Sequence, residues 1–321
     1  MTLTCRPLRD PTARALCEAL GALHADQGVE EINYLSRGVA PTTRGAGDQT
    51  IEAAEVYRAA LVKNHALFTR ITGHTVPWIF SATNRVRLEK ELLRLRTSLA
   101  AAGIAPHHAR YRENFARSID ALIRRTFNVS YKNHVGNEGT ADDVLSRGYA
   151  RCSEYVTLFY GIALMAGLTT YPMEIHQDTG LHAAIAVATG TTARPRHLIV
   201  DGQLGILERP PYRHYYFGGA ADVFASYLYN KSVVLAKTAT PAAMTTAGGL
   251  LAFAAQVAPH NAVVHFGLGS HYHEQRQWRT ALQHYRTALR LRPTDPTTKQ
   301  RYCFMKIMAG LGGCRRSNTL P

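Results

Sequence analysis

The chain has 321 residues, of which 46% are hydrophobic and 19% are charged. This composition is that of a globular protein and excludes wholesale disorder, while the length allows two or three domains. No run of about 18 apolar residues is present, so we expect neither a transmembrane helix nor a membrane partner. The N-terminus lacks the apolar core of a signal peptide, so secretory export is not expected either.

The formal net charge of +14 comes from 37 Lys and Arg residues against 23 Asp and Glu residues. Such an excess can attract nucleic acid or an acidic partner. No long basic run alternates with aromatic residues, however, as a nucleic-acid-binding strip would require. We therefore interpret the charge as spread over solvated helix faces and do not expect nucleic acid to be the partner.

Residues 1–115 are expected to form a helical region. Apolar residues recur at helical spacing over 12–25, 50–68 and 84–102, and Gly103 supplies a stop for the last of these helices. The region carries no chemical motif, so we interpret it as a scaffold or a partner-binding surface.

A further helix is expected over 108–127, and a short one begins after Thr140. Thr140 is suited to cap that short helix, and Asp143 completes an acidic variant of the capping box. The short helix should end near Gly148, just before the cysteine at position 152.

Cys152 stands at the start of an apolar helix that we expect to end at Gly167. The residues of this helix are apolar on nearly every side, which is typical of a central buried helix. Unpaired backbone N–H groups and the helix dipole favour a thiolate at this position and so lower its pKa. Cys152 is therefore a candidate nucleophile.

Three strands are expected after this helix, over 170–175, 181–188 and 197–200. If neighbouring strands pair in antiparallel fashion, His182 at the beginning of the second strand lies beside Asp201 at the end of the third. Thiolate, imidazole and carboxylate then act as nucleophile, general base and acid, and orienter of the imidazole. The sequence thus predicts a catalytic triad of Cys152, His182 and Asp201.

Two parts of this site stay open in the sequence. His176 could compete with His182 as the base, because it ends the preceding strand. The backbone N–H of Cys152 can supply one oxyanion donor, and a second must come from upstream. The candidates for the second donor are Tyr131, Asn133 and Asn137.

The order and spacing of these residues resemble the transglutaminase-like superfamily, and in particular its bacterial branch. The matching segments lie between 141 and 205 and include Arg151-Cys152-Ser153-Glu154-Tyr155, His182-Ala183 and Val200-Asp201. The resemblance implies an α+β, papain-like core in which a helix carrying Cys packs on an antiparallel sheet carrying His and Asp. It also implies chemistry on peptide or protein amide bonds through a Cys thioester, as in a protease, deamidase or transamidase.

The last third of the sequence contains a repeat of about 34 residues. Small and aromatic residues recur at equivalent positions: Ala247, Leu251, Ala254 and Pro259, then Ala281, Tyr285, Ala288 and Pro293. This pattern resembles the tetratricopeptide repeat, and a helix over 298–310 could cap the stack. Some bacterial members of the superfamily carry such a C-terminal segment.

Metal binding and disulfides are not expected. His-x-His on a helix points in two directions, so His265, His271, His273 and His284 form a poor ligand set. The other cysteines have no CxxC or CxxxC spacing and are interpreted as unpaired bystanders in a reducing cytoplasm: Cys5, Cys17, Cys303 and Cys314.

The expected organisation is a helical region at 1–115, a catalytic core at 116–218 and helical repeats at 219–321. The favoured function is a cytoplasmic cysteine hydrolase or acyltransferase with a protein or peptide substrate and no cofactor, and a protein partner could bind the repeats. Two positions depart from the family pattern: Ala150-Arg151, where Gly often precedes Cys, and Ala184, where Trp is often found. These departures motivate an alternative in which an inactive core is a scaffold and the repeats bind a partner.

Overall fold

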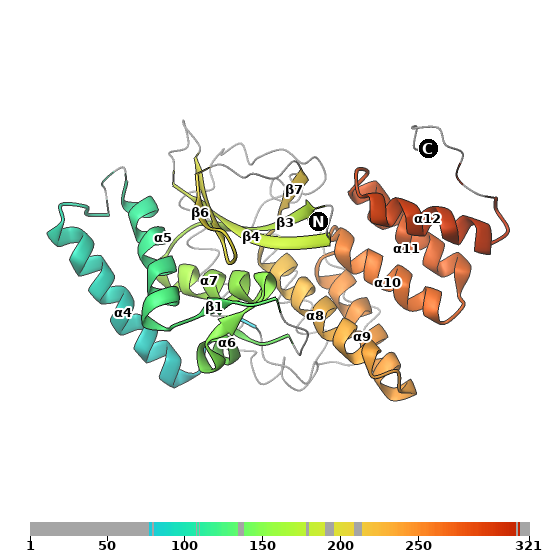
Figure 1. The fold of residues 1–321 in the computed structure, drawn as a ribbon, viewed down its shortest axis with the longest axis horizontal. Coiled ribbons are helices and arrows are strands. Elements are labelled where there is room, and N and C mark those ends of the chain that lie inside the picture. Colours follow the sequence, from blue (N-terminus) through green and yellow to red (C-terminus); the bar gives the residue numbers. More distant parts are fainter. Residues whose placement is uncertain are drawn as a thin grey trace. The chain divides into compact units, whose positions relative to one another are not determined.

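The computed structural model describes residues 77–312 and 314, except 79, 107, 109, 134–137, 178–179, 190–195 and 209–213. The helices expected over 12–25 and 50–68 lie outside these residues. The described residues divide into two compact units, unit 1 up to Val223 and unit 2 from Phe224 onward. Figure 1 labels the elements of both units. The domain boundaries expected after residues 115 and 218 stay predictions.

Two helices precede the sheet in unit 1. Helix α4 covers Ala82–Ala101 and is followed by Gly103, whose φ of +76° is left-handed. Helix α5 covers Tyr111–Ala121 and continues into a π-helical turn, η1, over Leu122–Thr126. The helices expected over 84–102 and 108–127 are therefore confirmed.

The short helix α6 covers Ala141–Arg147 and has the expected capping box. The Thr140 side chain accepts the Asp143 N–H, and the Asp143 carboxylate accepts the Thr140 N–H at 2.8 Å. Gly148 ends the helix with a φ of +74°. Strand β2, Tyr149–Ala150, follows at once and pairs in parallel with β1, Ser130–Tyr131.

Helix α7 covers Cys152–Ala166 and is the central helix of unit 1. It is buried on nearly every side, and Tyr155, Leu158, Phe159 and Ile162 have no exposed surface. It ends at Gly167, as expected from the sequence. The apolar pattern of the sequence therefore predicted both its extent and its burial.

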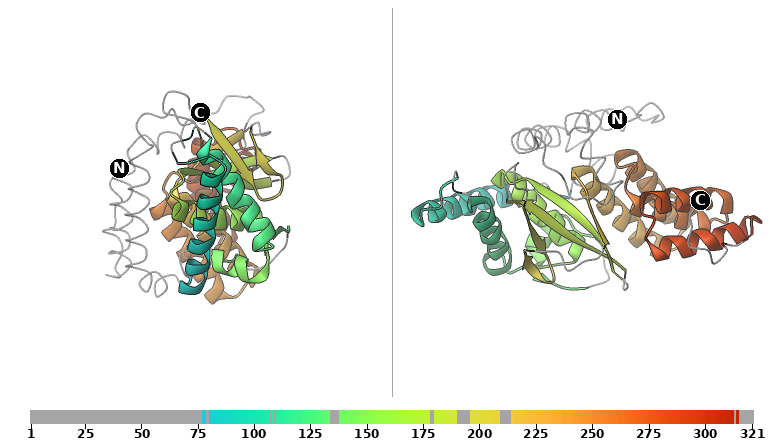
Figure 2. Two further views of the ribbon diagram at one scale, coloured as in Figure 1. Left: turned by 90° about the vertical axis from the view of Figure 1, so that its left-hand side faces the viewer. Right: turned by 90° about the horizontal axis from the view of Figure 1, so that it is seen from above.

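A five-stranded antiparallel sheet packs on α7, mainly through β4. Its strands, in chain order, are β3 (Thr170–Gln177), β4 (Gly180–Ala188), β5 (His197–Asp201), β6 (Gly205–Leu207) and β7 (His214–Phe217). Their order across the sheet is β6-β5-β4-β3-β7. Seen from above in Figure 2, the strands lie over α7. The three expected strands and their antiparallel pairing are confirmed, and β6 and β7 are additional.

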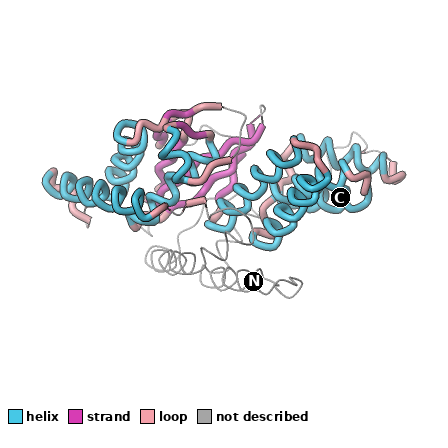
Figure 3. Tube along the Cα trace, turned by 90° about the horizontal axis from the view of Figure 1, so that it is seen from below, coloured by secondary structure: helices cyan, strands magenta, loops and turns pink. Residues whose placement is uncertain are grey.

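Unit 2 is helical throughout its described part, as Figure 3 shows. Its helices are α8 (Ala220–Lys237, which begins in unit 1), α9 (Pro241–Val257), α10 (Ala262–Glu274), α11 (Trp278–Leu291) and α12 (Pro296–Met308). The small residues of the sequence repeat are buried between helices. Helices α10 and α11 pack closely at Gly269, because a Cβ at this position would come within 2.8 Å of the Tyr285 ring. The assignment of these helices as tetratricopeptide repeats stays a prediction.

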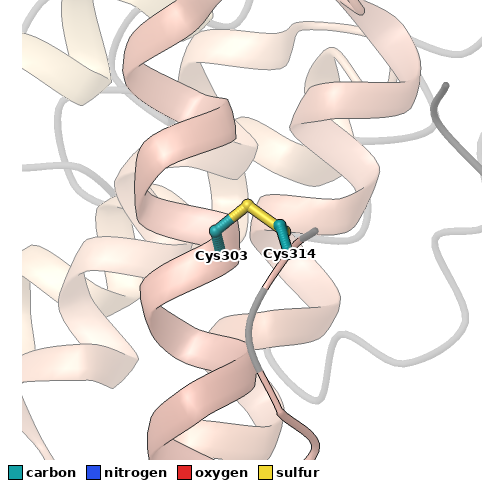
Figure 4. Close-up of a disulfide and its surroundings, with 2 residues drawn as sticks. All are labelled: Cys303 and Cys314. Atoms are coloured by element: carbon teal, nitrogen blue, oxygen red, sulfur yellow. A yellow bond between two sulfur atoms is a disulfide. The ribbon is translucent and has the colours of Figure 1, made fainter. Parts of the chain in front are cut away.

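Cys303 and Cys314 form a disulfide, with their Cα atoms 5.3 Å apart (Figure 4). The expectation that both are unpaired was wrong. After α12 the chain turns back through Gly310 and Gly312, which have φ values of +74° and +72°. Among the described residues Cys152 is the free cysteine.

No helix in the described part of the chain is both long and apolar enough to cross a membrane. The described residues combine helices with an antiparallel sheet, which confirms the expected α+β class at this coarse level.

Candidate active site

Cys152 is the first residue of α7, as expected. Arg151 precedes it in extended conformation, and the chain turns into the helix at the cysteine. Cys152 is half-buried, and its sulfur accepts hydrogen bonds from the backbone N–H groups of Ser153 and Ala183. Two donors from different elements, α7 and β4, therefore point at the sulfur.

His182 and Asp201 lie side by side, as the predicted strand pairing requires. His182 Nε2 is 2.7 Å from Asp201 Oδ2. The antiparallel register of β4 and β5, with Ile185 opposite Val200, brings the start of one strand to the end of the other. His182 also hydrogen-bonds the side chain of Cys152. The three predicted triad residues thus form one hydrogen-bonded chain.

The pKa values of Cys152 and His182 follow from the contacts that these two side chains make. Burial alone would raise the pKa of Cys152, but the hydrogen bond and charge of His182, with the two backbone N–H groups, lower it overall. Burial alone would lower the pKa of His182, but Asp201 and Cys152 raise it from 6.5 to about 9. Both shifts favour a thiolate beside an imidazolium at neutral pH.

Asp201 has no exposed surface and both of its carboxylate oxygens are bonded. Oδ2 contacts His182, and Oδ1 accepts the backbone N–H groups of Gln203 and Leu204 at 2.7 and 3.0 Å. The sequence predicted the carboxylate but not the turn of backbone donors that holds it. Gly202, directly after the aspartate, is the sequence signal for that turn.

The structure separates the three candidates for the second oxyanion donor. Tyr131 is the last residue of β1, opposite Ala150 in β2, and is half-buried. Burial raises its pKa, and so do the charges of Cys152 and Asp201, so its hydroxyl interacts electrostatically with the nucleophile. Asn133 is exposed beyond the end of β1, and Asn137 lies outside the described residues.

Charged residues next to Cys152 are paired with one another. Arg151 forms an ion pair with buried Glu138. Glu154 has no exposed surface, accepts the N–H groups of Gly139 and Arg151 at 2.7 and 2.9 Å, and pairs with Arg147. Burial would raise the pKa of Glu154, but these partners lower it. Glu154, in the first turn of α7, therefore links the start of this helix to the segment before it.

The other histidines considered in the sequence do not complete this site. The side chain of His176 lies outside the described residues, and the contacts to Cys152 and Asp201 come from His182. In unit 2, His265 and His284 stack with their Nδ1 atoms 3.4 Å apart, whereas His271 contacts Gln275. Among the described residues no cluster of three or more His, Cys, Asp or Glu side chains could hold a metal ion.

The sequence matches no protein-family model and no curated protein sequence. The resemblance to the transglutaminase-like superfamily therefore rests on the sequence motifs and stays a prediction. Chemically, the arrangement offers a nucleophile, an acid–base group and its orienter in one line.

Proposed function

We propose that the protein is a cysteine-dependent hydrolase or acyltransferase that acts on peptide or protein amide bonds. The observation that supports this proposal is the hydrogen-bonded chain from Cys152 through His182 to Asp201 at the start of a buried helix. A rigid helix holds the sulfur in place, which a nucleophile requires. The resemblance of the motifs to the transglutaminase-like superfamily supports the same chemistry.

In the proposed reaction the Cys152 thiolate attacks the carbonyl carbon of the amide and forms a C–S bond. The C–N bond then breaks, and the leaving amine takes a proton from the His182 imidazolium, which leaves a thioester on Cys152. Water or a second amine attacks the thioester after His182 removes its proton, and the thiolate is released. The raised pKa of His182 suits the first step, because the imidazolium is already formed at neutral pH.

The departure from the family pattern at Arg151 is compatible with this chemistry. Its guanidinium pairs with Glu138. Thiolate stabilisation at Cys152 instead comes from His182 and from backbone N–H groups. The second departure, Ala184, has no exposed surface and belongs to the packed core of the sheet.

The proposal is tested by the pH dependence of iodoacetamide alkylation at Cys152, followed by mass spectrometry of the Cys152 peptide. We expect rapid alkylation that persists below pH 7 and slows in His182→Ala. The same cysteine in the denatured chain is the control, since it should titrate near the ordinary thiol pKa of about 8.5. A native Cys152 that titrates like the denatured one, with no effect of His182→Ala, would refute the proposal.

A second candidate function is partner binding by unit 2. Helix α12 and the turn that follows it expose large apolar side chains: Phe304, Ile307, Met308 and Leu311. Exposed apolar surfaces of this kind mark interaction sites. If binding rather than catalysis is the function, a Cys152→Ala/His182→Ala variant will capture the same partner as the wild-type chain, and deletion of 220–321 will abolish capture.

A further inference from the structure

A network of three side chains lies beside the end of β5. Arg124 Nε is 3.0 Å from each carboxylate oxygen of Asp120, and the Tyr155 hydroxyl donates to the same carboxylate. The Arg124 guanidinium also lies over the Tyr155 ring, 5.0 Å from its centre. Tyr155 has no exposed surface and Asp120 is 8% exposed. The guanidinium is therefore held from two sides.

The other end of this guanidinium reaches the backbone of the proposed triad. Arg124 Nη2 donates to the carbonyl oxygens of Asp201 and Gly202 at 2.9 and 3.2 Å. Gly202 in turn packs on Tyr155, because a Cβ at this glycine would come within 2.9 Å of the tyrosine side chain. The turn that carries the Asp201 carboxylate is thus fixed by the same network.

The local backbone is shaped for this contact. Asp120 lies in α5, whereas Arg124 lies in the π-helical turn η1 that ends this helix. Single π turns inside helices are rare and frequent at functional sites. Arginine also suits the position, because a planar fork can bind a carboxylate and still donate to carbonyl oxygens, which a lysine ammonium cannot do in the same geometry.

We propose that Arg124 is a positioning residue that holds the Asp201 carboxylate against His182 through the carbonyl groups of Asp201 and Gly202. The hydrogen bonds of Arg124 go to the Asp120 carboxylate and to the carbonyl groups of Asp201 and Gly202, so its proposed effect on His182 passes through Asp201. A role of Arg124 in catalysis rests on the proposed function. Its effect on the contact between Asp201 and His182 does not depend on that function.

Positioning and simple charge predict opposite results when Arg124 is neutralised. If Arg124 acted only as a cation near Asp201, its loss would strengthen the attraction between Asp201 and the His182 imidazolium, and the pKa of His182 would rise. If Arg124 holds the turn in place, its loss loosens the Asp201–His182 contact, and the pKa falls toward the ordinary value. The direction of the shift therefore separates the two roles.

The test is an NMR titration of the His182 imidazole in the full-length protein and in three variants. Arg124→Gln and Arg124→Lys remove the fork, and Lys retains the charge. Arg125→Gln is the matched control, because Arg125 is exposed on the same turn. We expect the His182 pKa to fall by about one unit, a tenfold loss of proton affinity, in both Arg124 variants and to stay unchanged in Arg125→Gln.

An unchanged or raised His182 pKa in folded Arg124→Gln would overturn the inference. A His182 pKa in Arg124→Lys equal to that of the wild-type protein would also overturn it. If Arg124→Gln does not fold, Arg124→Lys decides by the same readout, with a fall supporting the inference and no change refuting it. The titration does not depend on enzymatic activity. A protein in which Cys152 proves unreactive but the His182 pKa still falls in the Arg124 variants would refute the proposed function and support the positioning.

Discussion

Replacement of Asp201 with Asn is the most direct probe of the hydrogen-bonded chain. Asn keeps an Oδ1 atom that can accept the N–H groups of Gln203 and Leu204, so the turn should survive. The change removes the negative charge 2.7 Å from His182 Nε2. It therefore tests the electrostatics of the pair rather than the integrity of the fold.

The size of the effect follows from the pKa of His182, which is raised from 6.5 to about 9. This shift corresponds to about 3 kcal/mol, shared between Asp201 and Cys152 as partners of the imidazole. At pH 7.5 an imidazole with the raised pKa is almost fully protonated, whereas one returned to its ordinary pKa is about one-tenth protonated. Asp201→Asn should thus remove up to about nine-tenths of the imidazolium, and it should raise the pKa of Cys152 because the thiolate loses its partner.

The assay combines NMR titration of His182 with the pH profile of Cys152 alkylation. We expect the His182 titration to move from about 9 toward 6.5 and the alkylation profile to move to higher pH. Because the folded-state pKa is raised, the stability that the pair contributes is present below pH 6.5 and is lost as the pH rises through about 9. The variant should therefore be destabilised more at pH 6 than at pH 9.5.

Asp142→Asn is the matched control, because Asp142 accepts hydrogen bonds from Ser81 and Asn84 rather than from His182. It should leave both titrations unchanged even if it lowers the melting temperature. An unchanged His182 titration in Asp201→Asn, or faster alkylation at pH 6, would refute the reasoning.

Two further predictions concern unit 2. Replacing Cys303 and Cys314 with Ser should lower the free energy of unfolding by about 2–3 kcal/mol, because the disulfide closes a loop with a sequence separation of 11. Urea denaturation followed by circular dichroism measures this loss, and a reductant should reproduce it in the wild-type chain but add nothing in the variant. Burial and the neighbouring His265 lower the pKa of His284 from 6.5 to about 4, so unfolding takes up a proton and stability falls as the pH drops between these values. His284→Gln should reduce the drop in melting temperature between pH 7 and pH 4.5, and an equal drop in both proteins would contradict this.

Local patterns were sufficient to predict the elements that carry the candidate site. The capping box at Thr140 and the glycine stop at Gly167 depend on residues within one turn of the helix ends. The apolar runs of the strands set their extent, and antiparallel pairing of neighbours in the chain then placed His182 beside Asp201. These features can be predicted from the sequence because the interacting residues are close in sequence or lie on adjacent strands.

Contacts between distant residues could not be predicted in this way. Arg124 and Asp201 are 77 positions apart in the sequence. The sequence alone does not show whether an arginine on a helix faces solvent or donates to a distant carbonyl oxygen. Strand β7 pairs with β3 rather than with β6, the strand before it in the chain. A hairpin pattern in the sequence therefore could not predict this pairing. The disulfide depends on a reversal through Gly310 and Gly312, and its spacing matches no cysteine motif.

Arg151 shows why a local departure from a family pattern is a weak argument about activity. In the sequence it is a cation beside the candidate nucleophile, and Ala150-Arg151 stands where the family often has Gly before Cys. In the structure Glu138, itself buried, forms an ion pair with it. The groups that lower the pKa of Cys152 are His182 and two backbone N–H groups, which do not involve the Arg151 side chain. The chemical consequence of a charged residue thus depends on its partner, and here Arg151 pairs with Glu138.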